Sequence, residues 1–286
     1  MDADEVKKAG VVGCGIMGSG IVEVLGSSGI EVVVVDVSEG IVAQGLEAIG
    51  QSLSKAVKGG KLTEDERTEV LARVDGRTDL EALREVDVVI EAASEDKGLK
   101  LDLFRRLDEV TRPAVVLATN TSSLPIAEIG SVTGRPDKVV GMHFFNPPTV
   151  MALVEVVQGL STSDETVRFT RALGERIGKT TVLSKDRAGF IVNLLLFPYL
   201  NNAVRMLEGG FAAREDIDEA IVLGLRHPMG PLAVLDLIGL DTALRISEVL
   251  FDEFKDRVYA PPTLLKRMVA AGHLGRKTGK GFYDYG

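Results

Sequence analysis

The chain of 286 residues has a single cysteine, Cys14, no tryptophan and only three histidines. One cysteine cannot form a disulfide within the chain, so a disulfide-stabilised scaffold is excluded. Three scattered histidines and one cysteine also give no cluster with the spacing of metal ligands. No metal is therefore expected, and Cys14 is expected to be a small packing residue.

Long apolar runs are missing as well. The longest, residues 190–200, is interrupted by Asn193 and Pro198 and falls short of the roughly 20 residues that a membrane span requires. The acidic start of the chain lacks the positive and apolar layout of a secretory signal. These absences predict a protein without a membrane partner, located in the cytoplasm.

Positive charge is in the minority, with 33 Lys and Arg against 42 Asp and Glu and a net charge of -9. A general nucleic-acid binder has the opposite balance, so no nucleic-acid partner is expected, and any anionic ligand requires a local basic site. Hydrophobic residues make up 45% of the chain, enough for a sizeable core, which excludes a disordered protein.

The first 184 residues alternate short β-branched runs with longer amphipathic segments. This alternation is typical of a parallel sheet covered by helices. The sequence therefore predicts an α/β fold, a Rossmann-type doubly wound sheet, with a helical insertion near residues 38–73. The strands are predicted at residues 31–36, 87–91, 114–119, 139–145, 153–157 and 180–183.

The chain changes character after a short polar hinge at residues 184–189. Strand-like runs stop there, and side chains at 190, 193, 197, 200, 204 and 207 follow the spacing of a helix face. Two domains are therefore predicted, residues 1–184 and an all-helical domain of residues 185–286. Pro198 is expected to kink the first long helix of this domain or to mark a boundary within it.

A glycine-rich turn follows the first apolar run, precedes a helical segment and is succeeded by a strand that ends in Asp36. Such glycines let the backbone approach a pyrophosphate, and the helix N-terminus presents N–H groups to it. Asp36, at the expected distance of about 20 residues, can accept hydrogen bonds from ribose hydroxyls and would repel the extra phosphate of NADP. NAD is the predicted cofactor, at a turn made by Gly13, Gly15, Ile16, Met17 and Gly18.

The glycine pattern by itself leaves alternatives. The glycines would also suit an ordinary loop, with Asp36 capping the next helix, and the same fingerprint occurs at FAD sites. An FAD enzyme would absorb visible light after purification.

His143 ends an apolar strand, and Glu155 lies in the next strand, after a proline-marked turn. A strand, a turn and a strand can bring the two side chains together. An imidazole held by a carboxylate is suited to take the proton of an alcohol while hydride leaves its carbon. The spacing leaves one alternative open, a core histidine bonded to the backbone with Glu155 at a solvent edge.

Six motifs occur together in the order 13–18, 120–123, 143–147, 153–155, 189–193 and 227–231. With these motifs, over nearly the whole chain, the sequence resembles the L-3-hydroxyacyl-CoA dehydrogenase family, in particular its bacterial 3-hydroxybutyryl-CoA dehydrogenases. The resemblance implies reversible, NAD-dependent oxidation of a short-chain (S)-3-hydroxyacyl-CoA to the 3-ketoacyl-CoA. It also implies that the helical domain binds the acyl-CoA substrate and forms a homodimer.

The resemblance further implies roles for single residues. His143 is the general base and Glu155 its partner, while Ser122 and Asn193 contact the reacting part of the substrate. Around NAD it places Glu95, Lys100, Ser122 and Asn146, and along CoA it places Ser52, Lys55 and Lys58. Leu194 stands where many relatives have arginine, so a polar contact of that arginine is not expected. Glu91 is equally suited to a structural role at the end of its strand.

Other functions stay open at this point. A dehydrogenase of a free hydroxy acid or a sugar acid would use the same nucleotide domain and the same two catalytic side chains. A non-catalytic NAD-binding relative would retain the fold alone, although the presence of Ser122, His143, Glu155 and Asn193 together argues against it. The remaining histidines, His227 and His273, have no acidic partner nearby in sequence and are expected to be structural or exposed.

Overall fold

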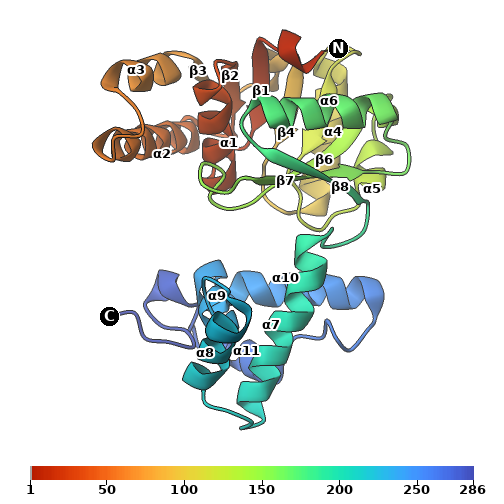
Figure 1. Cartoon of the computed structure of the whole chain (residues 1–286). Coiled ribbons are helices and arrows are strands. Elements are labelled where there is room, and N and C mark those ends of the chain that lie inside the picture. The colour runs from red at the N-terminus through yellow and green to blue at the C-terminus, as the bar shows by residue number, and fades with distance from the viewer. Residues whose placement is uncertain (1) are drawn as a thin grey trace. The chain divides into compact units, whose positions relative to one another are not determined.

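The computed structural model describes residues 2–286, which form two compact units, one ending at Arg187 and the other beginning at Ala188. The first unit contains a sheet with helices and the second is helical (Figure 1). The predicted fold class, a doubly wound α/β unit followed by helices, is confirmed. The observed break lies inside the segment 184–189 that the sequence marks as a hinge.

The first unit is built on an eight-stranded sheet with the order β3-β2-β1-β4-β5-β6-β7-β8. Neighbouring strands run parallel except for β6 and β7, which are antiparallel. Strand order reverses between β1 and β4, and ligands of such sheets bind beyond the carboxyl ends of the strands at this point. The strands are β1 Lys8–Val12, β2 Glu31–Val35, β3 Val74–Arg77, β4 Val88–Glu91, β5 Val116–Thr119, β6 Val139–Phe144, β7 Leu153–Gln158 and β8 Thr180–Lys185.

Helices cover both faces of this sheet, as continuous runs of buried valine and isoleucine in its strands require. One buried cluster joins alternate strand residues, such as Val88 and Ile90, with α1 and α6. The helices of this unit are α1 Ile16–Ser27, α2 Glu39–Lys58, α3 Glu64–Ala72, α4 Lys97–Val110, α5 Ile126–Gly130 and α6 Asp164–Arg176. Short 3-10 turns lie at Ala3–Glu5, Leu80–Leu83 and Pro136–Lys138.

The insertion predicted near residues 38–73 consists of α2 and α3, which lie together beside β3 (Figure 1). Both helices begin at side-chain caps, since the hydroxyl of Ser38 accepts a hydrogen bond from the Ile41 N–H and Thr63 forms a capping box with Glu66. Each helix of the insertion therefore begins where a local sequence signal places it.

The second unit packs five helices around one core that includes Phe197, Leu200 and Leu232. Helix α7 continues through Pro198, so a boundary at this proline is wrong. Phe197 and Leu200 are buried on either side of the proline, and their packing outweighs the one hydrogen bond that the proline ring cannot donate. The helices are α7 Val192–Glu208, α8 Arg214–Leu225, α9 Pro231–Ile238, α10 Leu240–Phe254 and α11 Thr263–Ala270, with a 3-10 turn at Arg276–Thr278.

Two buried aspartates bind the C-terminal segment to the helices of this unit. Asp218 accepts hydrogen bonds from the first N–H groups of α9, including that of Leu232 at 2.8 Å, and from the Tyr283 hydroxyl at 3.0 Å. Asp236 accepts from the backbone N–H groups of Phe282 and Tyr283, each at 2.9 Å. These hydrogen bonds join α8, α9 and the C-terminal segment.

A buried carboxylate on α1 connects this helix to α2 of the insertion. Glu23 of α1 is only 8% exposed, and the Ser52 hydroxyl of α2 donates a hydrogen bond to it at 3.0 Å. Burial raises the pKa of the Glu23 carboxyl, although the hydrogen bond from Ser52 acts in the opposite direction. Stability contributed by a group with a raised folded-state pKa is present at low pH and is lost as pH rises through that pKa.

Replacing Glu23 with glutamine is therefore expected to raise the Tm at neutral pH, by about 2–4 °C for each kcal/mol recovered. Glutamine keeps an oxygen acceptor for Ser52 and removes the buried charge. The gain should shrink as pH falls through the raised folded-state pKa and should vanish below the unfolded-state value of about 4.3, where glutamate is protonated in both states. Thermal unfolding from pH 4 to 8 measures it, with Glu47→Gln, an exposed residue, as the control. An equal gain in both variants would assign the effect to net charge instead of burial.

Candidate active site

A cavity of about 600 Å³ lies beyond the carboxyl ends of β1, β2 and β4, where the strand order reverses. Its wall includes Gly13, Gly15, Ile16, Met17 and Asp36, which are cofactor positions predicted from the sequence, while Gly18 supports the turn beneath it. Further lining residues include apolar side chains of the facing elements and one cation, namely Ile41, Leu80, Leu99, Leu103 and Arg106. The lining suits a ligand with a flat apolar part and a charged part.

At two positions of the turn, the neighbouring backbone is so close that only glycine fits. Gly13 has φ +98°, and a Cβ there would lie 2.7 Å from the carbonyl carbon of Ala92. A Cβ on Gly18 would lie 1.8 Å from the carbonyl oxygen of Gly13. Gly15 differs, since no heavy atom lies within 4 Å of the place where its Cβ would be. The space above Gly15 is therefore a cradle that a side chain would fill.

This cradle fits the pyrophosphate of NAD. Gly15 is the N-cap of α1 and supplies no side-chain cap to the first N–H groups of that helix, which suits an anionic ligand. The Asp36 carboxylate is oriented by two backbone donors, the N–H of Cys14 at 2.6 Å and that of Val37 at 2.7 Å. Each oxygen keeps acceptor capacity for a ribose hydroxyl. The alternative of an ordinary loop with Asp36 as the cap of the next helix does not fit, because Ser38 caps α2.

Cys14 is part of the packing beneath the turn. Its side chain is buried, and a Cβ on Gly45 of α2 would lie 2.1 Å from its sulfur. Burial, with a smaller contribution from Asp36, raises the pKa of the thiol to about 11. Cys14 therefore stays protonated at neutral pH, as expected for a packing residue.

His143 and Glu155 face each other across the antiparallel pair β6 and β7, whose register aligns them directly. The imidazole Nδ1 lies 2.8 Å from Glu155 Oε2, and the two side chains are 8% and 0% exposed. The alternative that places Glu155 at a solvent edge is wrong. Because Nδ1 faces the carboxylate, a proton exchanged with a ligand would be carried by Nε2.

Asn120 continues the sheet at the place where the ladder between β5 and β6 ends. Its side-chain oxygen accepts a hydrogen bond from the backbone N–H of Phe144, the residue after His143, at 2.8 Å. The bond anchors the end of β6 next to the imidazole. The sequence motif at 120–123 did not reveal this role, because the partner lies 24 residues further along the chain.

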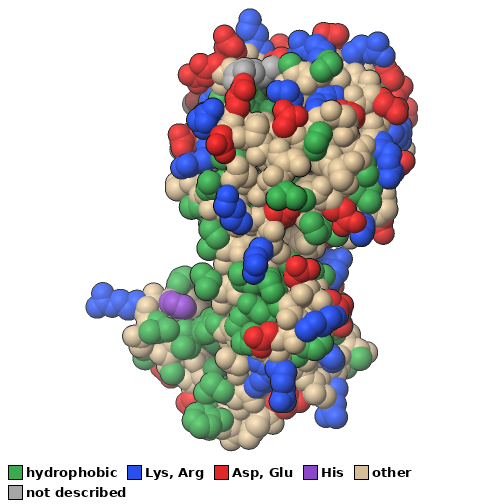
Figure 2. All heavy atoms as spheres, turned by 90° about the vertical axis from the view of Figure 1, so that its right-hand side faces the viewer, with side chains coloured by type: hydrophobic (Ala, Val, Ile, Leu, Met, Phe, Trp, Pro, Cys, Tyr) green, Lys and Arg blue, Asp and Glu red, His purple; other side chains and the backbone are tan. Residues whose placement is uncertain are grey.

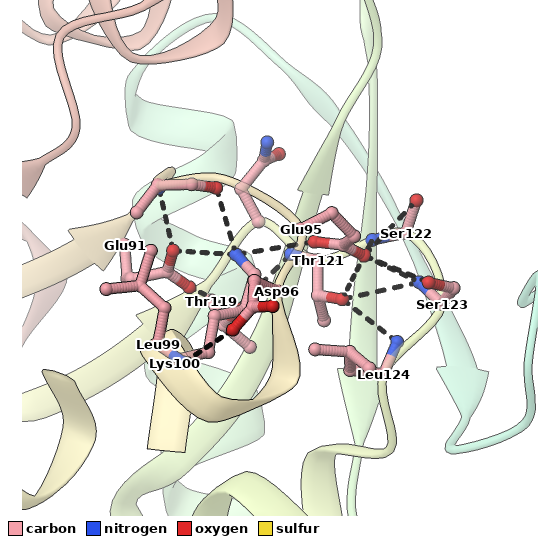
Figure 3. A network of polar contacts seen from close by, with 12 residues as sticks. Glu91, Glu95, Asp96, Leu99, Lys100, Thr119, Thr121, Ser122, Ser123 and Leu124 are labelled. Carbon is pink, nitrogen blue, oxygen red and sulfur yellow. Dashed lines mark hydrogen bonds and ion pairs between the residues drawn. The ribbon is translucent and has the colours of Figure 1, made fainter. Parts of the chain in front are cut away.

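Glu91 and Lys100 form a buried ion pair beside the cavity (Figure 3), with 0% and 1% of their side chains exposed. Lys100 Nζ lies 2.6 Å from Glu91 Oε1, 3.2 Å from the Ala93 carbonyl oxygen and 3.4 Å from Glu95 Oε2. The three protons of the ammonium thus have three acceptors within this unit. Direct contact of Lys100 with the cofactor stays a prediction.

Glu95 holds the loop that carries Ser122. Its Oε1 accepts hydrogen bonds from the backbone N–H groups of Ser122 at 2.9 Å and Ser123 at 3.2 Å, and from the Thr121 hydroxyl at 2.5 Å. Burial raises the pKa of the Glu95 carboxyl, but the Lys100 charge and these donors outweigh it, so the pKa lies below its usual value. Glu95 is therefore an anion at neutral pH.

The predicted CoA residues are divided between two places on α2. Lys55 and Lys58 line a cavity of about 440 Å³ between α2 and α3, whereas Ser52 bonds Glu23 and is not part of that lining. Arg67 of α3 also lines this cavity and forms an ion pair with Glu64. Sequence reasoning missed Arg67, because it lies on a separate helix and the local sequence does not show that it faces Lys55 and Lys58.

The other predicted residues do not line the nucleotide cavity. Asn146 is exposed and precedes a cis peptide bond to Pro147. Asn193 is buried in the first turn of α7, in the second unit, and the neighbouring Leu194 packs against the core of that unit. His227 is exposed. The roles of Asn146 and Asn193 toward ligands stay predictions.

Residues 2–286 lack two further features. No group of three or more His, Cys, Asp or Glu side chains in this part of the chain could hold a metal ion. No helix within it combines the length and apolar character needed to cross a membrane.

Comparisons with known proteins agree with this architecture. Residues 8–187 match the family model of the 3-hydroxyacyl-CoA dehydrogenase NAD binding domain, and residues 189–285 match that of the C-terminal domain. The chain is 48% identical to the 3-hydroxybutyryl-CoA dehydrogenase of Mycobacterium tuberculosis, over 99% of this chain and 100% of that protein. It is 47% identical to the enzyme of the same name from Clostridioides difficile, over 97% of this chain and 99% of that protein.

A solved structure extends the likeness to three dimensions. The crystal structure of (S)-3-hydroxybutyryl-CoA dehydrogenase PaaH1 from Ralstonia eutropha superposes with a TM-score of 0.95 at 45% identity, covering 99% of this chain and 100% of that one. The resemblance inferred from six sequence motifs is confirmed, and NAD is the cofactor of the matched domain. The chain belongs to the 3-hydroxyacyl-CoA dehydrogenase family.

Proposed function

We propose that this protein oxidises short-chain (S)-3-hydroxyacyl-CoA, with 3-hydroxybutyryl-CoA as the first candidate, to the 3-ketoacyl-CoA with NAD, and catalyses the reverse reduction. The observation that carries the proposal is the 2.8 Å contact between His143 and Glu155 on adjacent strands of the sheet. The choice of substrate rests on the relatives from M. tuberculosis and C. difficile, which are named 3-hydroxybutyryl-CoA dehydrogenases.

In this proposal His143 and Glu155 carry the proton chemistry. Bound NAD supplies the acceptor for the hydride that leaves the substrate carbon. His143 Nε2 takes the hydroxyl proton, and the Glu155 carboxylate orients the ring through Nδ1 and stabilises the imidazolium that forms. Burial of both side chains strengthens this interaction, because little water screens it. Ser122 and Asn193 are proposed to hydrogen-bond the substrate oxygen.

The same proposal assigns the ends of the cofactor. The Asp36 carboxylate accepts hydrogen bonds from the adenosine ribose and repels the extra phosphate of NADP. Glu95, Lys100, Ser122 and Asn146 are proposed to surround the nicotinamide end. Support for Glu95 comes from its contacts, which place a lowered-pKa carboxylate at the loop of Ser122.

The phosphates of CoA are proposed to bind in the cavity between α2 and α3. Three cations, Lys55, Lys58 and Arg67, line it together with one carboxylate, Glu47. The protein as a whole is acidic, so this local excess of positive charge supports an anionic ligand. Ser52, which bonds Glu23, is proposed to contact CoA from outside this cavity.

A comparison of two thioesters tests both the substrate and this site. The double variant Lys55→Gln/Lys58→Gln is expected to raise the KM for acetoacetyl-CoA about 10- to 30-fold, about 1 kcal/mol per lost contact. The KM for acetoacetyl-pantetheine, which lacks the nucleotide phosphates, should not change. Lys61→Gln, outside the cavity lining, is the matched control.

The assay also separates the alternative functions. Turnover of a free 3-hydroxy acid in preference to the CoA thioester would replace the proposed substrate with the alternative one. Absence of turnover with every substrate, combined with NADH binding, would favour a non-catalytic relative.

A homodimer formed through residues 185–286 is part of the proposal. Figure 2 shows hydrophobic side chains gathered on the visible face of the helical unit. Its exposed large hydrophobic residues include Leu195, Phe211, Leu223, Leu225 and Leu237. Exposed apolar patches of this kind mark interfaces. The location in the cytoplasm stays a prediction.

A further inference from the structure

The ion pair between Glu91 and Lys100 requires an explanation that the fold does not supply. Glu91 ends β4 and Lys100 lies in the first turns of α4, and neither is exposed to solvent. Desolvation of two charges offsets most of their attraction, so well-packed apolar side chains of similar volume usually stabilise a fold equally well. The position of the pair beside the nucleotide cavity suggests a task in the site.

The Glu91 carboxylate is fixed by three elements. Oε1 accepts hydrogen bonds from Lys100 Nζ at 2.6 Å and from the Ala93 N–H at 2.7 Å. Oε2 accepts a hydrogen bond from the Thr119 hydroxyl of β5 at 2.7 Å. Because the loop after β4 and the neighbouring strand β5 hold this carboxylate, it gives the Lys100 ammonium of α4 one defined position.

Lys100 transmits this position to Glu95. Its ammonium lies 3.4 Å from Glu95 Oε2, while Glu95 Oε1 holds the backbone of Ser122 and Ser123. Figure 3 shows these contacts as one continuous network from Glu91 to the serine loop. The Glu95 side chain is 22% exposed, so the network reaches from the fully buried strand end to a surface that ligands can touch.

The two distances show which carboxylate Lys100 contacts more closely. Two carboxylates compete for one ammonium, which lies closer to Glu91 at 2.6 Å than to Glu95 at 3.4 Å. Without a charge on Glu91, Lys100 would be drawn to Glu95, whose carboxylate would turn away from the serine N–H groups. The charge of Glu91 therefore keeps Glu95 available to the loop.

We propose that Glu91 is a positioning residue for the dehydrogenase reaction, acting through Lys100 on Glu95 and thereby on Ser122, without contact to substrate or cofactor. This inference rests on the proposed function for its effect on turnover. Its effect on NADH affinity does not depend on the substrate and rests on the proposed placement of Glu95 at the nicotinamide end.

A double-mutant cycle tests the proposal with Glu91→Gln, Glu95→Gln and the combination. Glu91→Gln is expected to lower kcat/KM for acetoacetyl-CoA and to weaken NADH binding, each about 10- to 100-fold. In the Glu95→Gln background the same change should alter either quantity less than about two-fold, because the route is already interrupted. Equal losses in both backgrounds would overturn the proposal.

The neutral pair Glu91→Gln/Lys100→Met covers the case in which Glu91→Gln alone does not fold. It should restore the Tm while kcat/KM and NADH affinity remain low. Recovery of Tm, turnover and affinity together would show that the pair only stabilises the fold. Asp108→Asn breaks another poorly exposed ion pair, with Arg135 at 2.6 Å, and should lower the Tm without changing kcat/KM or NADH affinity.

The two readouts keep the proposals apart. If the wild-type protein does not reduce acetoacetyl-CoA, the proposed function fails, yet fluorescence titration with NADH still completes the cycle. Non-additive affinities then support the positioning role, and additive affinities overturn it.

Discussion

Replacing His143 with glutamine is expected to lower kcat for acetoacetyl-CoA reduction by about 100- to 10,000-fold, the range of a positioned acid or base. Glutamine can still donate a hydrogen bond to Glu155, but it cannot exchange a proton with the substrate oxygen at neutral pH. His143 does not line the nucleotide cavity, so the NADH dissociation constant should stay close to that of the wild type. Steady-state kinetics and fluorescence titration measure the two quantities.

Glu155→Gln should also lower kcat, because the imidazolium then lacks its buried counter-charge at 2.8 Å. His227→Gln is the matched control, since His227 is exposed. The centroid of its ring lies 6.1 Å from that of the Tyr199 ring. Near-wild-type turnover in both the His143 and the Glu155 variants would rule out the proposed acid-base pair.

The strands could be predicted from the sequence because most of them are buried. Runs such as residues 32–35 are continuously apolar, which is the pattern of a strand covered on both faces. β3 was missed because its sequence, Val-Asp-Gly-Arg, has no such run. This strand lies at the edge of the sheet, pairs only with β2 and alternates half-buried with exposed residues. Its formation depends on the neighbouring strand, which a local pattern does not contain.

The site was predictable to the extent that its residues lie on neighbouring strands. His143 and Glu155 are joined by one turn, so an antiparallel pairing was enough to bring them together. The network from Glu91 through Lys100 to Ser122 was not predicted as a set of contacts. It joins segments more than 20 residues apart, and the side-chain conformations that join them follow from packing.

The proline of α7 shows a case in which a local sequence rule gave the wrong prediction. Proline predicts a kink or a boundary, but the helix continues through Pro198 because residues on both sides of it are buried in one core. Tertiary packing therefore decides the extent of this helix, while the local sequence decides only where a hydrogen bond is missing.

Gly15→Ala is expected to weaken NADH binding about 10- to 100-fold without destabilising the protein. Gly15 has φ −74°, which alanine adopts without strain, and no heavy atom lies within 4 Å of the added Cβ. The methyl group would instead occupy the cradle at the N-terminus of α1, where overpacking against the pyrophosphate costs about 1–3 kcal/mol. Fluorescence titration with NADH and thermal unfolding measure the two effects.

Two other glycines give this prediction its controls. Gly50→Ala in α2 also meets no atom within 4 Å, so it should leave NADH affinity unchanged and stabilise the helix slightly. Gly18→Ala should lower both the Tm and the affinity, because its Cβ would lie 1.8 Å from the Gly13 carbonyl oxygen. If Gly15→Ala bound NADH as tightly as Gly50→Ala, the pyrophosphate would not pass over Gly15, and the cavity beside Asp36 would have to hold the nucleotide in another orientation.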